Sequence, residues 1–111
     1  MTTQTCRATL FGGSKALNFT ATCTDDQWNE LKDSVFTLSL YEVMQGETIT
    51  AIRGSYAAGG AQLRIRNTQS NQVKVIECLP MTKGEYVRPL TRPVQIQMYD
   101  VVEVFSTIAG S

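Results

Sequence analysis

The stretch 61-AQLRIRNTQSNQVKVIECL-79 decides the fold of this chain, because hydrophobic and polar residues alternate through both of its halves. The first half places aliphatic residues at alternate positions from Ala61 to Ile65, and the second half does so at Val73 and Val75. A polar loop, 67–71, separates the two halves. Alternation with a period of two on both sides of a short polar loop is typical of an antiparallel β-hairpin with one buried and one wet face. We therefore predict a hairpin over this stretch.

Further runs with the same period extend the hairpin to a sheet. The first two runs flank Gly12-Gly13-Ser14-Lys15, where glycine accepts the positive φ that a tight turn needs. A turn is expected at 44–47, and 80–93 is expected to be irregular, with two Arg-Pro pairs that hold the backbone extended. The last run is expected to form one long strand, bent near Asp100. Apart from the two halves of the central hairpin, the alternating runs cover 5–11, 16–23, 36–41, 48–56 and 94–105.

One helix is expected, at about residues 25–35. Thr24 and Gln27 have the spacing of a capping box. Asp25 and Asp26 follow the cap, where carboxylates favour the positive end of a helix dipole; neighbouring helical residues diverge, so this pair does not suggest a catalytic site. The apolar residues at helical spacing are Trp28, Leu31 and Val35.

These elements together predict the fold class. We expect an α+β chain that is predominantly antiparallel β-sheet, with about seven strands and one short helix packed on the sheet. A chain of 111 residues is long enough to bury a core without disulfides or metal, so we expect a single β-rich domain spanning 1–111.

Composition limits the classes of partner. Charged residues make up 18% of the chain, against a usual fraction of about 25%, and ten basic residues balance ten acidic ones. No overall field would therefore steer the molecule to nucleic acid or a membrane. The sequence has no long apolar run and begins with polar residues, so we expect no membrane contact and a place in the cytoplasm or within an assembled particle.

Catalysis has the weakest support. The chain contains no His, so it lacks the usual proton shuttle near neutral pH and both Ser-His and Cys-His pairs. Cys6, Cys23 and Cys78 are scattered without a zinc-type spacing, and we expect buried thiols, no metal site and no cofactor. Whether Cys6 and Cys23 form a disulfide across the first hairpin depends on a register that the sequence leaves open.

A local concentration of positive charge is a stronger indication of function. If the hairpin closes over 67–71, Arg64, Arg66 and Lys74 become neighbours on one surface. Like charges opposite each other destabilise a sheet, so we expect compensation by phosphate or by a carboxylate, from Glu47, Glu103 or another subunit. The alternative is a solvated face with internal ion pairs. The candidate nucleic-acid contacts are Arg64, Arg66, Lys74, Arg88 and Arg92.

Amide and hydroxyl groups with tyrosines form a third pattern, on the polar phases of the strands. Such surfaces occur in carbohydrate sites and in polar subunit interfaces, and also as ordinary soluble β-surface. The candidate ligand or interface residues are Tyr41, Tyr56, Tyr99, Gln95 and Gln97.

The expected function is therefore structural. We expect a non-catalytic, self-assembling homo-oligomer, of the kind that forms the coat of a viral or phage particle, whose basic sheet face contacts nucleic acid. The alternative is a small β-sheet binding module, lectin-like or protein-binding, that acts through the Thr-, Gln- and Tyr-rich faces.

Overall fold

The structure is a computed structural model that describes residues 3–13, 15–24, 27–56, 61–79 and 84–106. Eight strands and one short helix make up this part of the chain. The elements are β1 (Thr3–Gly12), β2 (Lys15–Thr24), β3 (Trp28–Asp33), α1 (Leu40–Met44), β4 (Thr48–Tyr56), β5 (Ala61–Asn67), β6 (Val73–Leu79), β7 (Gly84–Gln95) and β8 (Asp100–Ser106).

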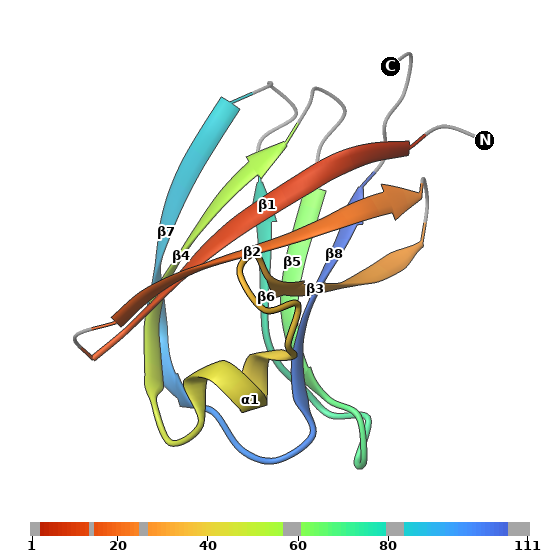
Figure 1. Ribbon diagram of the computed structural model, residues 1–111. Helices are drawn as coiled ribbons and strands as arrows, with labels where there is room; N and C mark the ends of the chain where they lie inside the picture. The colour runs from red at the N-terminus through yellow and green to blue at the C-terminus, as the bar shows by residue number, and fades with distance from the viewer. Residues whose placement is uncertain (1–2, 14, 25–26, 57–60, 80–83, 107–111) are drawn as a thin grey trace.

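All eight strands belong to one antiparallel sheet, in the order β6-β5-β8-β3-β2-β1-β4-β7 (Figure 1). The strand β3 is the junction of the sheet. Its first residues pair with β8 and its last residues pair with β2. The predicted class, α+β with a dominant antiparallel sheet, is confirmed.

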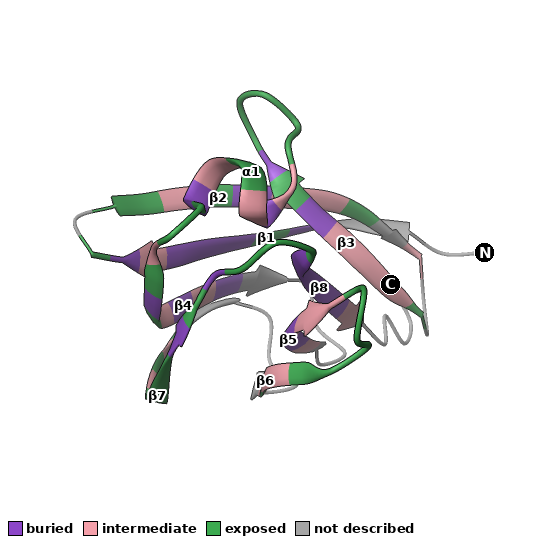
Figure 2. Ribbon diagram, turned by 90° about the horizontal axis from the view of Figure 1, so that it is seen from below, coloured by how far each residue is buried: buried purple, intermediate pink, exposed green. Residues whose placement is uncertain are grey.

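The sheet curls around its own core. In Figure 2, seen from below, β1, β2 and β4 form one wall, β5, β6 and β8 form the other, and β3 crosses between them. The alternating inner residues of both walls meet in a single apolar cluster, as period-two patterning requires. α1 covers one end of this core with the buried side chains of Leu40 and Met44. The fully buried core residues include Leu10, Phe19, Leu31, Ile49, Ile65 and Val102.

Both predicted hairpins are confirmed. β5 pairs with β6 around the predicted loop, with Ile65 opposite Val75, and the Oδ1 of Asn67 accepts hydrogen bonds from the backbone N–H of Gln69 and Ser70. β1 pairs with β2 along its whole length, and Gly13 in the connecting turn has φ +58°. The glycine and the asparagine that favour turns in the sequence therefore lie in the turns that connect these strands.

The helix predicted at 25–35 is wrong. Residues 28–33 form strand β3, in which Leu31 and Asp33 are buried and Lys32 between them is exposed; Asp25 and Asp26 lie outside the described residues. Trp28 and Leu31 occupy opposite phases of the strand, and Val35 is 76% exposed. Local capping signals were overridden because β8 and β2 both need a hydrogen-bonded neighbour at this position.

The helix lies further along the chain, where a strand was expected at 36–41. Residues 34–39 form a loop and α1 follows at Leu40–Met44. The backbone N–H and the Oγ of Ser39 both donate to Glu42 Oε1, at 3.2 and 2.9 Å, which is the capping arrangement of an S-x-x-E sequence. No helix in the described part of the chain is long and apolar enough to cross a membrane.

The C-terminal third also differs from the prediction. The segment expected to be irregular contains β7, and the single long strand expected at 94–105 is divided by a turn at 97–100 into the end of β7 and β8. Pro89 and Pro93 are tolerated in β7 because it is an edge strand, where a missing N–H costs no ladder hydrogen bond. The division raises the strand count from about seven to eight.

The structure predicts opposite results for two residues that helical packing would treat alike. Leu31→Ala is expected to lower the free energy of unfolding by about 2–5 kcal/mol, because it empties a fully buried site. Val35→Ala should change it by less than about 0.5 kcal/mol, because that side chain is exposed. Urea unfolding followed by Trp28 fluorescence measures both values, and equal losses would favour the helical arrangement.

Candidate functional site

The two arginines of the central hairpin share one carboxylate within the molecule. Glu103 on β8 lies opposite Arg64 on β5, and its Oε1 accepts a hydrogen bond of 2.8 Å from the Nε of both Arg64 and Arg66. Arg66 Nη2 adds a third bond to Oε2 at 3.1 Å. The Glu103 carboxylate, on the neighbouring strand β8, therefore compensates the positive charge of the two arginines. This is one of the alternatives expected from the sequence.

Glu103 is buried enough for this pairing to matter energetically. Its side chain is 9% exposed, against 18% and 21% for Arg64 and Arg66. Burial alone would raise the pKa of the Glu103 carboxyl, but the hydrogen bonds from Arg66 and Arg64 outweigh it and lower the pKa below 4.5. The stability that the pairing contributes is thus present above about pH 4.5 and is lost as the pH falls through the lowered pKa.

Aromatic packing fixes the position of Arg64. Its guanidinium carbon lies 3.8 Å from the centre of the Trp28 ring, and Trp28 packs on Phe105 at a centroid distance of 5.5 Å. A guanidinium held between an indole face and a carboxylate is restrained on two sides. Arg64 is therefore part of the outer surface of the sheet rather than a mobile contact.

Lys74 lies on a different surface. Its Nζ donates to Asp100 Oδ2 at 2.7 Å and to Gln97 Oε1 at 3.1 Å, and the side chain of Asp100 is fully buried. Because side chains alternate along β8, Asp100 and Glu103 point to opposite faces. The prediction that Arg64, Arg66 and Lys74 share one surface is wrong, and their contact with nucleic acid stays a prediction.

The gap between the two edge strands gathers several predicted residues. A groove of about 570 Å³ lies between β6 and the second half of β7. Arg92 and Gln95 are exposed along it, and Lys74 spans it by bonding to the backbone oxygen of Gln95 at 3.5 Å. Arg88 is half-buried on the first half of β7, opposite Ile52. The predicted site residues that line the groove are Lys74, Arg92, Gln95 and Gln97.

The predicted tyrosines do not form one site. Tyr41 packs against the core from α1, whereas Tyr99 is 49% exposed in the turn before β8, with φ +73°. Tyr56 belongs to β4, and its side chain lies outside the described residues. These positions are on separate parts of the fold, so a ligand site built from the tyrosines together finds no geometric support.

The cysteine and metal expectations can be compared with the described residues. Cys6 is a buried thiol opposite Ala21, and Cys23 is opposite Gln4, so Cys6 is not part of a disulfide. Within the described ranges, no three side chains of the His, Cys, Asp or Glu type lie close enough to hold a metal ion.

The loop between β3 and α1 is a feature that the sequence did not predict. Asp33, at the end of β3, is 6% exposed, and its Oδ2 accepts hydrogen bonds from the backbone N–H of Val35 and Phe36 at 3.0 and 2.9 Å. Its Oδ1 accepts from the N–H of Leu38 at 2.7 Å. The backbone bonds from Phe36 and Leu38 lower the pKa of this carboxyl below 3.8. One carboxylate therefore holds the whole loop in place.

This well-fixed loop exposes large apolar side chains, which we call the apolar loop surface (Val35, Phe36 and Leu38). Val35 is 76% exposed and Phe36 is 71% exposed. Beside them lies an open hollow of about 480 Å³ between the loop, the start of β2 and α1, lined by Leu17, Val43 and the apolar loop surface itself. A rigid loop that presents apolar side chains beside an apolar hollow is typical of an interaction surface.

The pattern of alternating residues does not predict the apolar loop surface. Val35-Phe36 was divided between an expected helix and an expected strand, both of which would have buried one of the two residues. The available signal was the Asp33-Ser34 pair followed by adjacent apolar residues, because Asp and Ser favour turns in which a side chain bonds the next amides.

Two carboxylates face each other on the outer surface, which predicts a stabilising substitution. Glu30 lies opposite Glu103; burial raises the pKa of Glu30 above 4.5, with Lys32 opposing and Glu103 adding to the rise. Glu30→Gln should raise the free energy of unfolding near neutral pH by about 0.5 kcal/mol, because a charge that folding disfavours is removed. The gain should vanish below about pH 4.5, where Glu30 is protonated. A gain that persists in thermal unfolding at acid pH would contradict the electrostatic cause.

Removing the Asp33 carboxylate should loosen the loop. With Asp33→Ala, the amides of Val35, Phe36 and Leu38 lose their acceptor, so their hydrogen exchange should become at least about tenfold faster while β1 and β2 stay protected. Ser34→Ala is the matched control, because its backbone N–H bonds to Asn18 and not to Asp33. Unchanged exchange in Asp33→Ala would show that other contacts hold the loop.

Comparison with known proteins adds no assignment. No family model matches the sequence, no curated protein matches it, and no solved structure matches the fold.

Proposed function

We propose that this protein is a non-catalytic structural subunit that assembles with copies of itself, as the subunits of a viral or phage coat do. The observation that carries the proposal is the apolar loop surface. Val35 and Phe36 are exposed although three hydrogen bonds to Asp33 fix the loop that carries them. A fixed apolar protrusion gains free energy when a partner removes it from water, and little ordering entropy opposes this because the loop is already rigid.

A second copy of the chain is the occupant that the surface suits. The hollow beside Phe36 is lined mainly by apolar side chains and is adjacent to the protrusion. A two-fold arrangement therefore allows the Phe36 ring of each copy to enter the hollow of the other, so that one surface patch is self-complementary. Lys15 and Glu42 at the margin of the hollow supply opposite charges for a polar rim. The balanced charge of the chain leaves no net repulsion between copies.

The sheet offers a second contact, which growth beyond a dimer requires. β6 and β7 are the two ends of the described sheet, and each has one unpaired edge. β6 contains no proline and exposes Val73 and Ile76 at 41% and 52%, whereas Pro89 and Pro93 interrupt the donors of β7. Edge strands with exposed apolar residues pair readily with another chain. The proposal therefore assigns the β6 edge to the second contact.

Light scattering tests the proposed assembly. The wild type is expected to scatter as an oligomer, and Phe36→Asp should shift the mass toward that of the 12.3 kDa monomer, because a charge cannot be buried in the apolar contact. We expect the association constant to fall at least about tenfold.

Met98→Asp is the matched control, because Met98 is 55% exposed in the turn before β8, away from the hollow. A wild type that is monomeric at every concentration would overturn the proposal. An equal loss of mass in Phe36→Asp and Met98→Asp would remove the apolar loop surface from it.

A further inference from the structure

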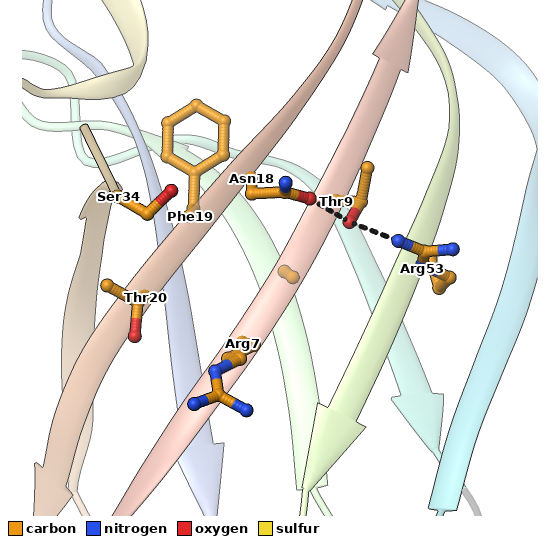
Figure 3. A pocket seen from close by; sticks show the side chains of 8 residues that line it. Arg7, Thr9, Asn18, Phe19, Thr20, Ser34 and Arg53 are labelled. Atoms are coloured by element: carbon orange, nitrogen blue, oxygen red, sulfur yellow. Dashed lines mark hydrogen bonds between the residues drawn. The ribbon is translucent and has the colours of Figure 1, made fainter.

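A row of polar side chains crosses the outer face of the sheet from β4 to β2. Thr9 on β1 lies opposite Arg53 on β4 and opposite Asn18 on β2. Arg53 Nη2 donates to Thr9 Oγ1 at 3.1 Å, and Thr9 donates to Asn18 Oδ1 at 2.7 Å, as the dashed lines of Figure 3 show. Thr9, at the centre of this relay, is 7% exposed, whereas Asn18 is exposed and Arg53 is half-buried. It fixes one edge of the Arg53 guanidinium and leaves the Asn18 amide NH₂ available as a donor.

Arg7 adds a second guanidinium to the same face. It lies two residues before Thr9 on β1, opposite Thr20 on β2. Its cross-strand diagonal neighbour on β4 is Arg53, a relation that places Cβ atoms about 7–8 Å apart. The side chain of Arg7 forms no hydrogen bond or ion pair with another described residue, whereas the side chains of Arg64 and Arg66 both bond to Glu103. Lys32 on β3, opposite Thr20, extends the positive charge along the row.

These side chains surround a hollow of about 430 Å³, which we call the Arg7–Arg53 hollow. Figure 3 shows its polar groups, drawn from β1, β2, β4 and the residue after β3, Ser34. No carboxylate is among its described lining residues. The hydroxyls of Thr20 and Ser34 are the remaining polar groups, so the polar part of the described lining carries positive charge and hydrogen-bond donors but no anion. The lining residues are Arg7, Ala8, Thr9, Asn18, Phe19, Thr20, Ser34 and Arg53.

We propose that the Arg7–Arg53 hollow binds a phosphate group. Two guanidinium groups match the oxygens of a phosphate in charge and in fork geometry, and hydroxyl and amide donors complete its hydrogen bonds. Bound phosphate would also relieve the repulsion between these neighbouring like charges, for which the described lining offers no carboxylate. The group comes either from the backbone of a single-stranded nucleic acid or from free inorganic phosphate, which share this chemistry. The site adjoins the apolar loop surface, because Ser34 directly precedes Val35, but it uses different side chains. Its test measures phosphate binding and not assembly, so its failure and the failure of the proposed function are distinguishable.

The other basic side chains near the sheet are less available to an anion than those of the Arg7–Arg53 hollow. Arg64 and Arg66 both bond to Glu103, and Lys74 bonds to Asp100, so an incoming phosphate would have to compete with a bonded carboxylate. At the Arg7–Arg53 hollow there is no such competitor among the described residues, and Thr9 holds Arg53 ready for the ligand.

Titration of the full chain with two probes tests the site: inorganic phosphate and a short oligothymidylate, the latter at several salt concentrations. Wild type is expected to bind at least one probe. Arg53→Gln and Arg7→Gln should each weaken that binding at least about tenfold, because a charge-assisted bond is lost. For the oligothymidylate, each variant should reduce the slope of log K against log salt by about 0.7, the value for one phosphate contact to a single strand.

Arg92→Gln is the matched control, because it removes the same charge from an exposed position in the groove between β6 and β7. Binding of the oligothymidylate but not of phosphate would support the site and identify nucleic acid as the source; the reverse would support it and identify inorganic phosphate. No binding of either probe would overturn the proposal. Arg92→Gln weakening the binding as much as Arg53→Gln would overturn it in favour of the edge groove, and circular dichroism excludes unfolding as the cause.

Discussion

The pairing of β3 with its two neighbours is the constraint on which the rest of the structure depends. Trp28 to Leu31 pair with β8, and Lys32 and Asp33 pair with β2, so this short strand connects the two walls of the described sheet by backbone pairing. Leu31 faces the core, while Glu30 faces the charged cluster around Glu103. The end of β3 places Asp33 where it can hold the following loop. The core, the pairing of Arg64 and Arg66 with Glu103, and the apolar loop surface therefore all depend on the position of β3.

The hairpins could be predicted from the sequence because their information is local. The alternation around 67–71 and the glycines between the first two runs specify strands and turns through neighbours a few residues apart, and the structure confirms both. The helix prediction failed at 25–35 for the opposite reason. Caps and helical spacing are local signals, whereas the strand that replaced them is required by β8, whose sequence lies about seventy residues away.

Prediction of the candidate site was limited by the same distance in sequence. Glu103 could be named as a partner for Arg64 and Arg66 because like charges on adjacent residues of one face need an anion. Nothing local places Lys74 beside Asp100, because that contact depends on how the sheet curls. Likewise, Arg7 and Arg53 come from strands that are far apart in the chain, and only the β1–β4 register makes them diagonal neighbours. Sequence periodicity therefore cannot predict surfaces that combine residues from strands far apart in the chain.

The Asp100 carboxylate has a mechanical consequence for the curled sheet. It bonds at once to Lys74 of β6, to Asn67 of β5 and to the backbone N–H of Gln97, while Lys74 also reaches the last residue of β7. Among the described residues, these bonds join the two edges of the sheet at the corner where β7 ends and β8 begins. Separating β6 from β7 at this corner would leave the fully buried Asp100 carboxylate without its ammonium partner, which is strongly destabilising.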